Sequence, residues 1–326
     1  MVSVPPTSPD QHPCRILSLD GGGAKGFYTL GVLKQIEALV KRPIYECFDL
    51  IFGTSTGGII ASLLALGYAV DDVHGLYKQH VPNIMRKLTR AQKSAALAHL
   101  ATTVFGTRTF EDVKTGVGIV ATHWDLEKPM IFKTSVAQAH GRHNTFVPGF
   151  GCTIGEAVRA SCSAYPFFEK TTVTISDGTK ITLIDGGYCA NNPTLYAIAD
   201  AVMALKRSPA DLRVVSVGVG NYPEPRHWKP KRWPSWLIKR LRSVQLLQKT
   251  LNVNTVSMEQ LRAILFKNIS AVRIDDTFTK PELATDLMEH NLKKLNSLYQ
   301  HGGESFAKHE TALKTLLLGG AQETNG

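Results

Sequence analysis

The stretch ILSLDGGGAKGFYTLGVLKQIEAL, residues 16–39, predicts a short buried strand, a tight turn with three consecutive glycines, and then a helix. After the turn, apolar residues recur at helical spacing at Phe27, Leu30, Leu33 and Ile36. A glycine-rich turn between a strand and a helix presents backbone N–H groups to an anion. The stretch therefore indicates an α/β protein with an anion-holding loop. It leaves open whether the anion is a pyrophosphate or the oxyanion of a reacting ester.

Further strand-like runs alternate with helical patterns along the chain. The runs cover residues 14–19, 47–53, 117–123, 128–134, two segments around the Asp177-Gly178 turn, and 212–220. Such alternation predicts a three-layer α/β/α fold with a mainly parallel central sheet, to which the Asp-Gly hairpin adds an antiparallel piece. Beyond residue 235 the pattern is mostly helical, and the last two helices are expected at 280–300 and 303–318.

The 326 residues show no obvious linker, but their composition distinguishes three segments. Residues 1–13 are rich in proline and polar residues and are expected to form a flexible tail; 14–220 are expected to form the core that carries the motifs, and 221–326 a mostly helical extension packed on the same domain. The longest apolar stretch, 59–70, is shorter than the ~20 residues that span a bilayer. We therefore expect a core helix there, and a cytoplasmic protein without a secretory signal.

The net charge of +10 and the pI near 9.3 favour an anionic partner. Residues 226–242 hold seven Lys or Arg and three of the four tryptophans, a composition typical of segments at a lipid headgroup boundary. The candidate membrane contacts are Trp228, Trp233, Trp236, Lys229, Lys231 and Arg232. An ordinary solvated loop and helix is the alternative, and we expect no DNA or RNA polymer as partner. The five cysteines lack metal or disulfide spacing, so buried thiols and no metal site are expected.

The glycine turn taken alone has two interpretations. Gly21 to Gly26 fit the G-x-G-x-x-G fingerprint of dinucleotide-binding proteins. That fingerprint needs an acidic residue at the end of the second strand to bind a ribose, whereas Glu46 and Asp49 precede that strand's end. The glycines therefore do not decide for a nucleotide.

The second strand instead ends in Gly53-Thr54-Ser55-Thr56-Gly57, which fits the G-x-S-x-G nucleophile elbow. Such a turn exposes the serine hydroxyl at a helix N-terminus, where developing negative charge is favoured. We therefore interpret Ser55 as a nucleophile, with Gly53, Thr54, Thr56 and Gly57 as its elbow.

A serine needs a base to take its proton. Asp185 ends the run KITLID and opens the sequence Asp185-Gly186-Gly187, which places a carboxylate at a strand end. His227, His290, His301 and His309 follow it, so the chain order of a Ser-Asp-His triad is also present. No strand-to-loop pattern frames these histidines, and we interpret them as surface residues.

Residues 20–26, 53–57 and 185–187, in this order, resemble the three motifs of the patatin-like phospholipases. The segment AVRASCSAYPFF at 157–168 and the run VVSVGVG at 214–220 are also similar, so the resemblance covers roughly residues 14–220. It implies a Ser55–Asp185 dyad without histidine, an acyl-enzyme, no required metal or cofactor, and a phospholipid membrane surface as substrate. The implied oxyanion hole is the loop Gly21, Gly22, Gly23, Ala24, Lys25 and Gly26, with the N–H groups of Gly22 and Gly23 facing the ester. Lys25 stands where the family usually has Arg, and it lacks the planar fork of that side chain.

A finer resemblance, in the compact chain and its helical C-terminal third, is to bacterial patatin-like effectors of cyclic-oligonucleotide antiphage signalling. It implies a cyclic nucleotide as activator and a peripheral position at the inner membrane when active, and it leaves homo-oligomers open. A stand-alone lipid hydrolase fits the residues equally. The remaining alternatives are an α/β-hydrolase with a Ser-Asp-His triad and a signalling module that uses the glycine loop for phosphate. Residues 82–110 are a candidate lid, for which we favour simple helix packing.

Overall fold

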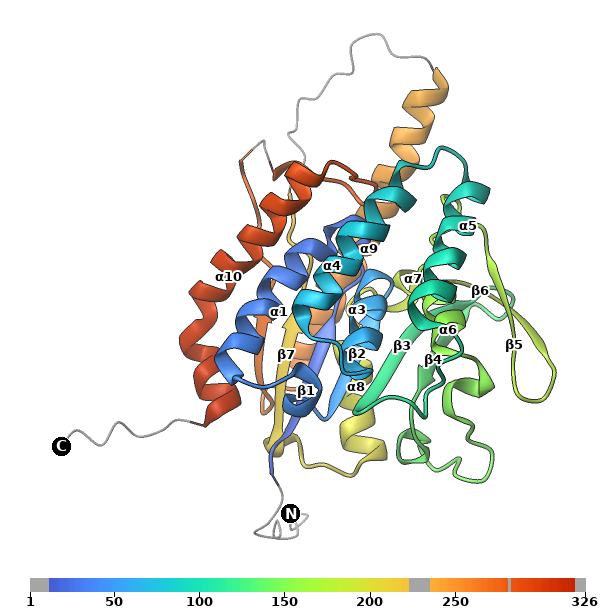
Figure 1. Ribbon diagram of the computed structural model, residues 1–326. Helices are drawn as coiled ribbons and strands as arrows, with labels where there is room; N and C mark the ends of the chain where they lie inside the picture. The colour runs from blue at the N-terminus through green and yellow to red at the C-terminus, as the bar shows by residue number, and fades with distance from the viewer. Residues whose placement is uncertain (1–11, 223–234, 281–282, 320–326) are drawn as a thin grey trace.

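The computed structural model describes residues 12–222, 235–280 and 283–319. These residues form an eight-stranded sheet with helices on both sides, so the predicted three-layer α/β/α fold is confirmed (Figure 1). The strands are β1 (Cys14–Leu19), β2 (Leu50–Thr54), β3 (Gly116–His123), β4 (Lys128–Lys133), β5 (Thr171–Thr174), β6 (Lys180–Asp185), β7 (Leu212–Val217) and β8 (Ser270–Ile274).

The helices follow the predicted alternation with the strands. They are α1 (Gly26–Val40), α2 (Ile44–Cys47), α3 (Thr56–Ala65), α4 (Val70–Arg86), α5 (Arg90–Leu100), α6 (Ile154–Ser161), α7 (Gly187–Ala190), α8 (Thr194–Ala199), α9 (Ser235–Leu265) and α10 (Leu292–Leu318). Short 3-10 turns occur at Gly23–Lys25, Val136–Gln138, Pro148–Gly151 and Pro209–Asp211, and π turns extend α5 and α8 at Ala101–Phe105 and Asp200–Ala204.

The strand order is β5-β6-β3-β2-β1-β7-β8, and β4 also pairs with β3. Five neighbouring strands are mutually parallel, namely β3, β2, β1, β7 and β8. Strands β4 and β6 run antiparallel to β3, and β5 runs antiparallel to β6. The sheet is thus mainly parallel with an antiparallel end, as predicted. The loops after β1 and β2, which carry the first two motifs, meet at one edge of the sheet because the two strands are adjacent and parallel.

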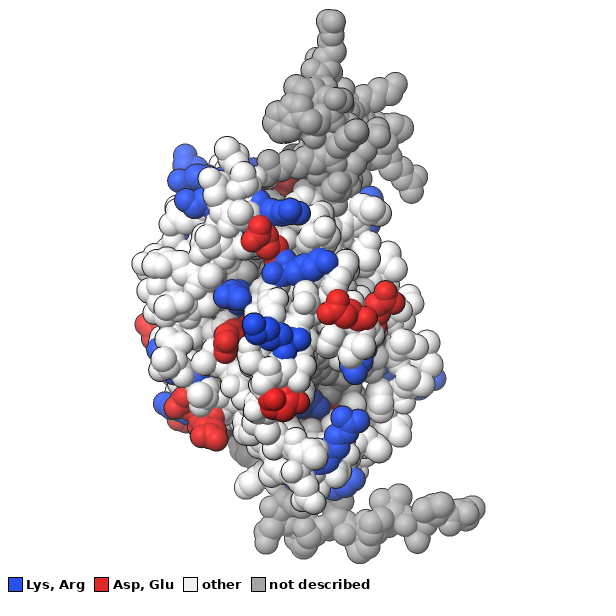
Figure 2. Space-filling model, turned by 90° about the vertical axis from the view of Figure 1, so that its right-hand side faces the viewer, with Lys and Arg blue, Asp and Glu red and all other residues white. Residues whose placement is uncertain are grey.

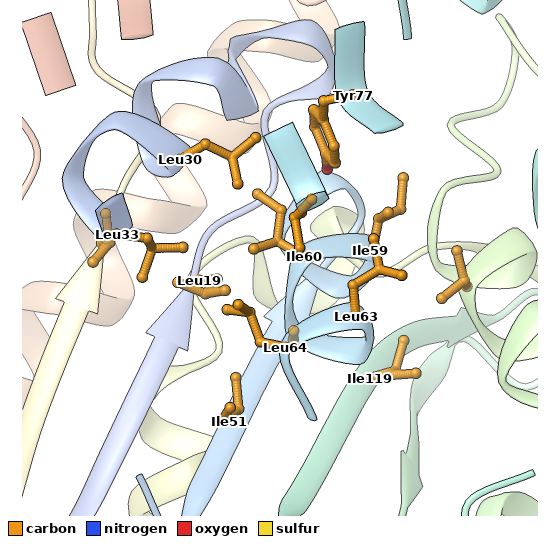
Figure 3. Close-up of a cluster of buried hydrophobic side chains, with 14 of the residues drawn as sticks. Leu19, Leu30, Leu33, Ile51, Ile59, Ile60, Leu63, Leu64, Tyr77 and Ile119 are labelled. Atoms are coloured by element: carbon orange, nitrogen blue, oxygen red, sulfur yellow. The ribbon is translucent and has the colours of Figure 1, made fainter. Parts of the chain in front are cut away.

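Alternation along the central strands builds two separate apolar layers. Ile16 and Phe52 belong to the cluster that packs with α8, whereas Leu19 and Ile51 belong to the larger cluster with α1, α3 and α4. Figure 3 shows this larger core, in which side chains of α1 and α3 meet those of β1, β2 and β3. All ten residues of α3 are buried, so the apolar stretch at 59–70 begins in a core helix, as predicted. No helix among the described residues has the length and apolar character needed to cross a bilayer.

Strand β8 lies in the part beyond residue 220 that is expected to be mostly helical, and the sequence pattern does not reveal it. This strand pairs in parallel with β7 and lies opposite Ser216 at Arg273, so the boundary predicted at residue 220 divides the sheet. Its five residues, SAVRI, include a charged residue at the fourth position, which hides the strand pattern. The charge is accommodated because Arg273 donates hydrogen bonds to Asp20 and to Ser216.

The last two predicted helices are a single helix, and it begins later than expected. Helix α10 starts after Asn291, whose side chain accepts a hydrogen bond from Lys293 N and caps it. Gly302, which falls between the two predicted helices, lies inside α10, where this helix crosses α1. A Cβ atom at Gly302 would lie 2.2 Å from the carbonyl oxygen of Tyr28, and one at Gly31 would lie 1.9 Å from that of Tyr299. The glycines therefore allow close helix contact and do not end the helix.

Candidate active site

Ser55 occupies the turn between β2 and α3. Its backbone has φ 53° and ψ −120°, a conformation that a residue with a side chain adopts at a cost of about 1–3 kcal/mol. The backbone N–H of Ser55 donates a hydrogen bond of 2.8 Å to Ser161 Oγ, and that hydroxyl in turn donates to Val120 O. The turn is thus held from the neighbouring strand β3 and from the last residue of α6.

The four residues predicted to flank Ser55 hold this turn in place. A Cβ atom at Gly53 would lie 2.2 Å from the carbonyl oxygen of Gly57, so the turn closes on itself. Thr54 Oγ1 donates to Ala190 O at 2.7 Å, and Thr56 Oγ1 is hydrogen-bonded to the hydroxyl of Tyr77 at 2.8 Å. The elbow is therefore fixed to α4 on one side and to α7 on the other.

The register of the sheet brings Asp185 to Ser55 across β3. Thr54 lies opposite Val120, and the next residue of β3, Ala121, lies opposite Asp185. Ser55 Oγ donates a hydrogen bond of 2.7 Å to Asp185 Oδ2, and the other carboxylate oxygen accepts the N–H of Gly187 at 2.7 Å. The structure thus joins the two side chains that the sequence analysis singled out, with the carboxylate oriented by its own D-G-G turn.

Burial raises the pKa of Asp185 from 3.8 to about 6, although its hydrogen bonds with Gly187 N and Ser55 act in the opposite direction. The carboxyl is 3% exposed and has no cation as partner in the hydrogen bonds described for it. A carboxylate with a pKa near 6 is ionised at neutral pH yet basic enough to accept a proton. Asp185 is therefore suited to act as a general base.

The downstream histidines lie elsewhere in the described part of the chain. Their ring nitrogens are near Met288 O for His290, the carboxylate of Glu304 for His301, and Ser305 O for His309. His227 lies outside the described residues. Among the residues that the structure describes, the hydrogen bonds to the carboxylate of Asp185 come from Ser55 and Gly187, so the geometry favours a dyad over a triad.

Backbone hydrogen bonds narrow the predicted oxyanion loop from six residues to two. Four of the six N–H groups are already occupied, which is a correction to that set: Gly21 donates to Asn191 O, Ala24 to Leu287 O, Lys25 to Gly22 O and Gly26 to Gly23 O. The N–H groups of Gly22 and Gly23 have no partner among the described residues, and both glycines line the cavity that contains Ser55. These two donors are therefore available to an oxyanion.

Lys25 has a structural role in this loop. Its ammonium group is buried and donates to Gly220 O at 3.1 Å, and burial lowers the pKa of the amine. Gly220 belongs to the loop after β7, and its N–H donates to Asp275, which follows β8. Asp275 pairs with Arg273, and Arg273 also pairs with Asp20. Lys25 and Arg273 thus stabilise the loop that presents Gly22 and Gly23.

Ser55 and Asp185 open into a cavity of about 60 Å³ with mostly apolar walls. This volume is far below the ~300–1,000 Å³ of ordinary small-molecule sites, so little free space remains beside Ser55. The apolar wall residues include Ile59, Val81, Ile84, Met85, Leu97, Phe168, Leu247, Leu251, Leu287 and Met288. Residues 82–110 pack mainly as helices, and Ile84, Met85 and Leu97 of this segment line the cavity. Leu247 and Leu251 of α9 meet Leu287 in a separate apolar cluster over the site.

A family model of patatin-like phospholipases matches residues 17–198, more than half of the chain. The chain belongs to the patatin-like phospholipase family.

Two curated relatives and one solved structure are similar to this chain. The chain is 60% identical over 305 residues to the cUMP-AMP-activated phospholipase of Escherichia coli, covering 94% of each protein. It is 28% identical over 215 residues to the cGAMP-activated phospholipase of Pseudomonas aeruginosa strain BWHPSA011 / Pa011, covering 62% of this chain and 61% of that one. The crystal structure of VipD from Legionella pneumophila matches with a TM-score of 0.46 at 13% identity, covering 94% of this chain and 67% of that chain.

Two residues that support this patatin-like site escaped the sequence analysis. Ser161 holds the backbone of Ser55, and it lies within the segment that resembles the family. Asn191 follows α7 directly, and its side-chain amide donates to Gly21 O at 3.1 Å and to Thr255 Oγ1 at 2.7 Å. Asn191 thus links the glycine loop to α9. The position of Asn191 shortly after the D-G-G turn is the sequence feature that could have identified it.

The predicted membrane contacts fall outside what the structure describes. Trp228, Lys229, Lys231, Arg232 and Trp233 lie among residues 223–234, and Trp236 lies in the first turn of α9, whose side chains are not described. In the described part of this patatin-like protein, no group of His, Cys, Asp and Glu side chains is arranged to hold a metal ion.

Proposed function

We propose that this protein hydrolyses acyl esters of membrane phospholipids with Ser55 as nucleophile and Asp185 as proton acceptor, and that a cyclic oligonucleotide switches it on in antiphage defence. Membership of the patatin-like phospholipase family makes it a lipid-hydrolysing enzyme. The observation that carries the proposed mechanism is the 2.7 Å hydrogen bond from Ser55 Oγ to Asp185 Oδ2 at the base of an apolar cavity.

The reaction follows from the positions of these groups. Asp185 accepts the hydroxyl proton while Ser55 Oγ attacks the ester carbonyl, and negative charge grows on the carbonyl oxygen. The N–H groups of Gly22 and Gly23 stabilise that charge, and the loss of one such donor typically raises the barrier by ~3 kcal/mol. Collapse of the tetrahedral intermediate expels the lysophospholipid alkoxide, which takes the proton back from Asp185. Water, deprotonated by the same carboxylate, then attacks the acyl-enzyme. The fatty acid leaves as Ser55 Oγ takes the proton back from Asp185, which restores the dyad.

The small volume of this cavity supports regulation by a ligand. An acyl chain needs far more room than the space beside Ser55, and α9 and residues 283–291 contribute the side chains that restrict it. The relatives in Escherichia coli and Pseudomonas aeruginosa are named for activation by cUMP-AMP and cGAMP, respectively. We therefore infer that a cyclic dinucleotide favours a more open state of this cavity.

Mass spectrometry of lipids tests the proposed function directly. Wild-type protein and Ser55→Ala are incubated with vesicles of bacterial phospholipids, with and without cUMP-AMP. We expect lysophospholipid and free fatty acid from the wild type in the presence of cUMP-AMP, and none above background from Ser55→Ala. Products from Ser55→Ala would overturn the mechanism, whereas full activity without nucleotide would overturn only the regulation.

The described part of α9 supports a membrane surface as the site of action. Leu246, Val253 and Ile264 are 68%, 69% and 63% exposed and share one face of the helix at 100° per residue. Leu247 and Leu251 lie on the adjoining face and line the cavity. The basic, Trp-rich residues 226–242 lead into and begin this helix. We therefore propose that anionic lipid covers the exposed face and that acyl chains pass from there to Ser55.

The double variant Val253→Asp with Ile264→Asp tests this face. We expect the rate of hydrolysis of anionic vesicles to fall at least about tenfold. Two aliphatic side chains that become buried in lipid contribute roughly 3 kcal/mol to interfacial binding. Hydrolysis of a soluble short-chain ester should not change, and Leu126→Asp, at an exposed leucine after β3, is the matched control. Equal losses on both substrates would contradict a lipid-covered face. A change from dimer to monomer in light scattering would assign the face to a second copy of the chain.

A further inference from the structure

A second cavity lies outside the active site, between α5, the end of α6 and the start of β5. It measures about 270 Å³, several times the volume beside Ser55 and close to the lower limit of ~300 Å³ for small-molecule sites. Its polar lining differs from the apolar walls of the active site: Ser94, Arg159, Ser163, Glu169, Lys170 and Thr171 contribute to it. Neither the dyad nor the glycine loop reaches this cavity, so the proposed reaction leaves it unexplained.

Two cations of this cavity are available to a ligand. In the described part of the chain, neither Arg159 nor Lys170 forms an ion pair, although both line the cavity. Lys170 Nζ lies 3.5 Å from the centre of the Trp124 ring and 5.2 Å from that of Tyr165, so the two rings position its charge. A guanidinium, an ammonium and several hydroxyls together are the groups that bind a phosphodiester.

We propose that this cavity binds one nucleotide of a cyclic dinucleotide. Arg159 and Lys170 hold the phosphodiester, and Glu169 accepts a ribose hydroxyl. The volume suits one nucleotide, and the second remains at the open side. The proposal deepens the proposed regulation and rests on it, because it assigns a place to the activator.

The charge on this side of the molecule fits a small ligand. Figure 2 shows the side that carries α5 and β5, where basic and acidic side chains are interspersed among uncharged ones. A nucleic-acid polymer requires a broad basic surface because its affinity comes from many phosphate contacts. Two cations in a bounded cavity instead match one phosphodiester of a small ligand.

Two contacts connect this cavity to the active site. Leu97 lines both cavities, so α5 forms the wall between them. Ser163 lines the second cavity, and its carbonyl oxygen accepts the backbone N–H of Asp185 at 3.0 Å. Helix α5 is also tied to the cavity rim, because Ser94 Oγ accepts the N–H of Glu169 at 2.8 Å. A ligand that draws α5 toward Arg159 and Lys170 therefore moves Leu97 away from the space beside Ser55. This displacement links binding to opening.

The test measures binding and activation separately. Calorimetry with cUMP-AMP in the absence of lipid compares the wild type with Arg159→Ala, Lys170→Ala and Lys293→Ala, the last of which removes an exposed charge on α10. We expect each cavity variant to bind about tenfold or more weakly, since a charge-assisted hydrogen bond contributes about 1.5–3 kcal/mol. The concentration of cUMP-AMP needed for half-maximal lipid hydrolysis should rise by the same factor. Lys293→Ala should match the wild type.

Circular dichroism shows whether each variant is folded, and Arg159→Lys should recover part of the affinity if the charge is what matters. Unchanged binding in both alanine variants would overturn the proposal. Glycerophosphoglycerol, the soluble headgroup of phosphatidylglycerol, is titrated in parallel. If it binds the cavity as tightly as cUMP-AMP does and displaces it, the cavity is a site for lipid headgroups. Wild-type protein that binds cUMP-AMP at this cavity but leaves lipid intact would support the cavity and overturn the proposed catalysis.

Discussion

Asp185→Asn is expected to lower kcat for lipid hydrolysis by about 10,000-fold, the loss seen when a catalytic aspartate becomes an amide in a serine hydrolase. The asparagine retains the shape of the side chain and an oxygen for the Gly187 N–H, yet it cannot accept the proton of Ser55. Steady-state rates on vesicles with saturating cUMP-AMP measure this loss. The double variant with Ser55→Ala should be no worse than Ser55→Ala alone, because the two groups act as one unit.

The same substitution should stabilise the fold at high pH. The folded protein holds Asp185 with a pKa of about 6, above the ordinary 3.8, so folding favours the protonated carboxyl. The ionised form therefore weakens the fold increasingly as the pH rises from 4 to 6, by about 3 kcal/mol for a shift of about 2 pH units. Below pH 4 the carboxyl is neutral in both states and the penalty is absent.

Thermal unfolding across pH measures this difference. Asp185→Asn should melt at a higher temperature than the wild type at pH 8, and the two curves should converge toward pH 4. In the wild type, kcat/KM should rise with pH and reach half its plateau near pH 6, as the base ionises. A variant that is less stable than the wild type at pH 8 would contradict the buried, unpaired state of this carboxylate.

Gly23→Ala is expected to lower kcat by about 100- to 1,000-fold, the effect of losing an oxyanion donor. Gly23 has φ +58°, and a Cβ atom there would lie 2.4 Å from Leu287 O, which itself accepts the N–H of Ala24. Neither the backbone of residue 287 nor the loop can yield without moving the N–H groups of Gly22 and Gly23. Rates on a soluble ester report the loss without interference from membrane binding.

Gly75→Ala is the matched control for that substitution. Gly75 lies in α4, and a Cβ atom there would have no neighbour within 4 Å. Alanine should keep full activity and stabilise the helix by up to about 1 kcal/mol. Full activity in Gly23→Ala would remove the glycine loop from the proposed mechanism and would leave the dyad unaffected.

Local sequence predicted the parts of the site whose geometry depends on a few consecutive residues. The elbow at Ser55 is an example, because two glycines and a buried strand before a buried helix define its turn. The choice of donors in the glycine loop is not local. Gly21 and Ala24 are excluded by the carbonyls of Asn191 and Leu287, which approach from distant parts of the chain. The sequence therefore predicts the loop, whereas the tertiary structure determines that the N–H groups of Gly22 and Gly23 remain available within it.

The elements that the sequence missed owe their form to long-range partners. Strand β8 carries Arg273 inward because Asp20 is there to meet it, and no window of five residues contains that information. Gly302 resembles a helix end until Gly31 of α1 is placed against it. The antiparallel direction of β6 likewise follows from its pairing with β3, and that pairing sets the height at which Asp185 meets Ser55.

The pairing of Arg273 with Asp20 spans 253 positions of the chain. During synthesis the first partner leaves the ribosome long before the second, so the glycine loop lacks its brace until β8 has emerged and docked beside β7. A nascent chain that already contains both Ser55 and Asp185 is consequently without a properly supported oxyanion site. We therefore expect hydrolytic activity to appear only after β8 has been synthesised.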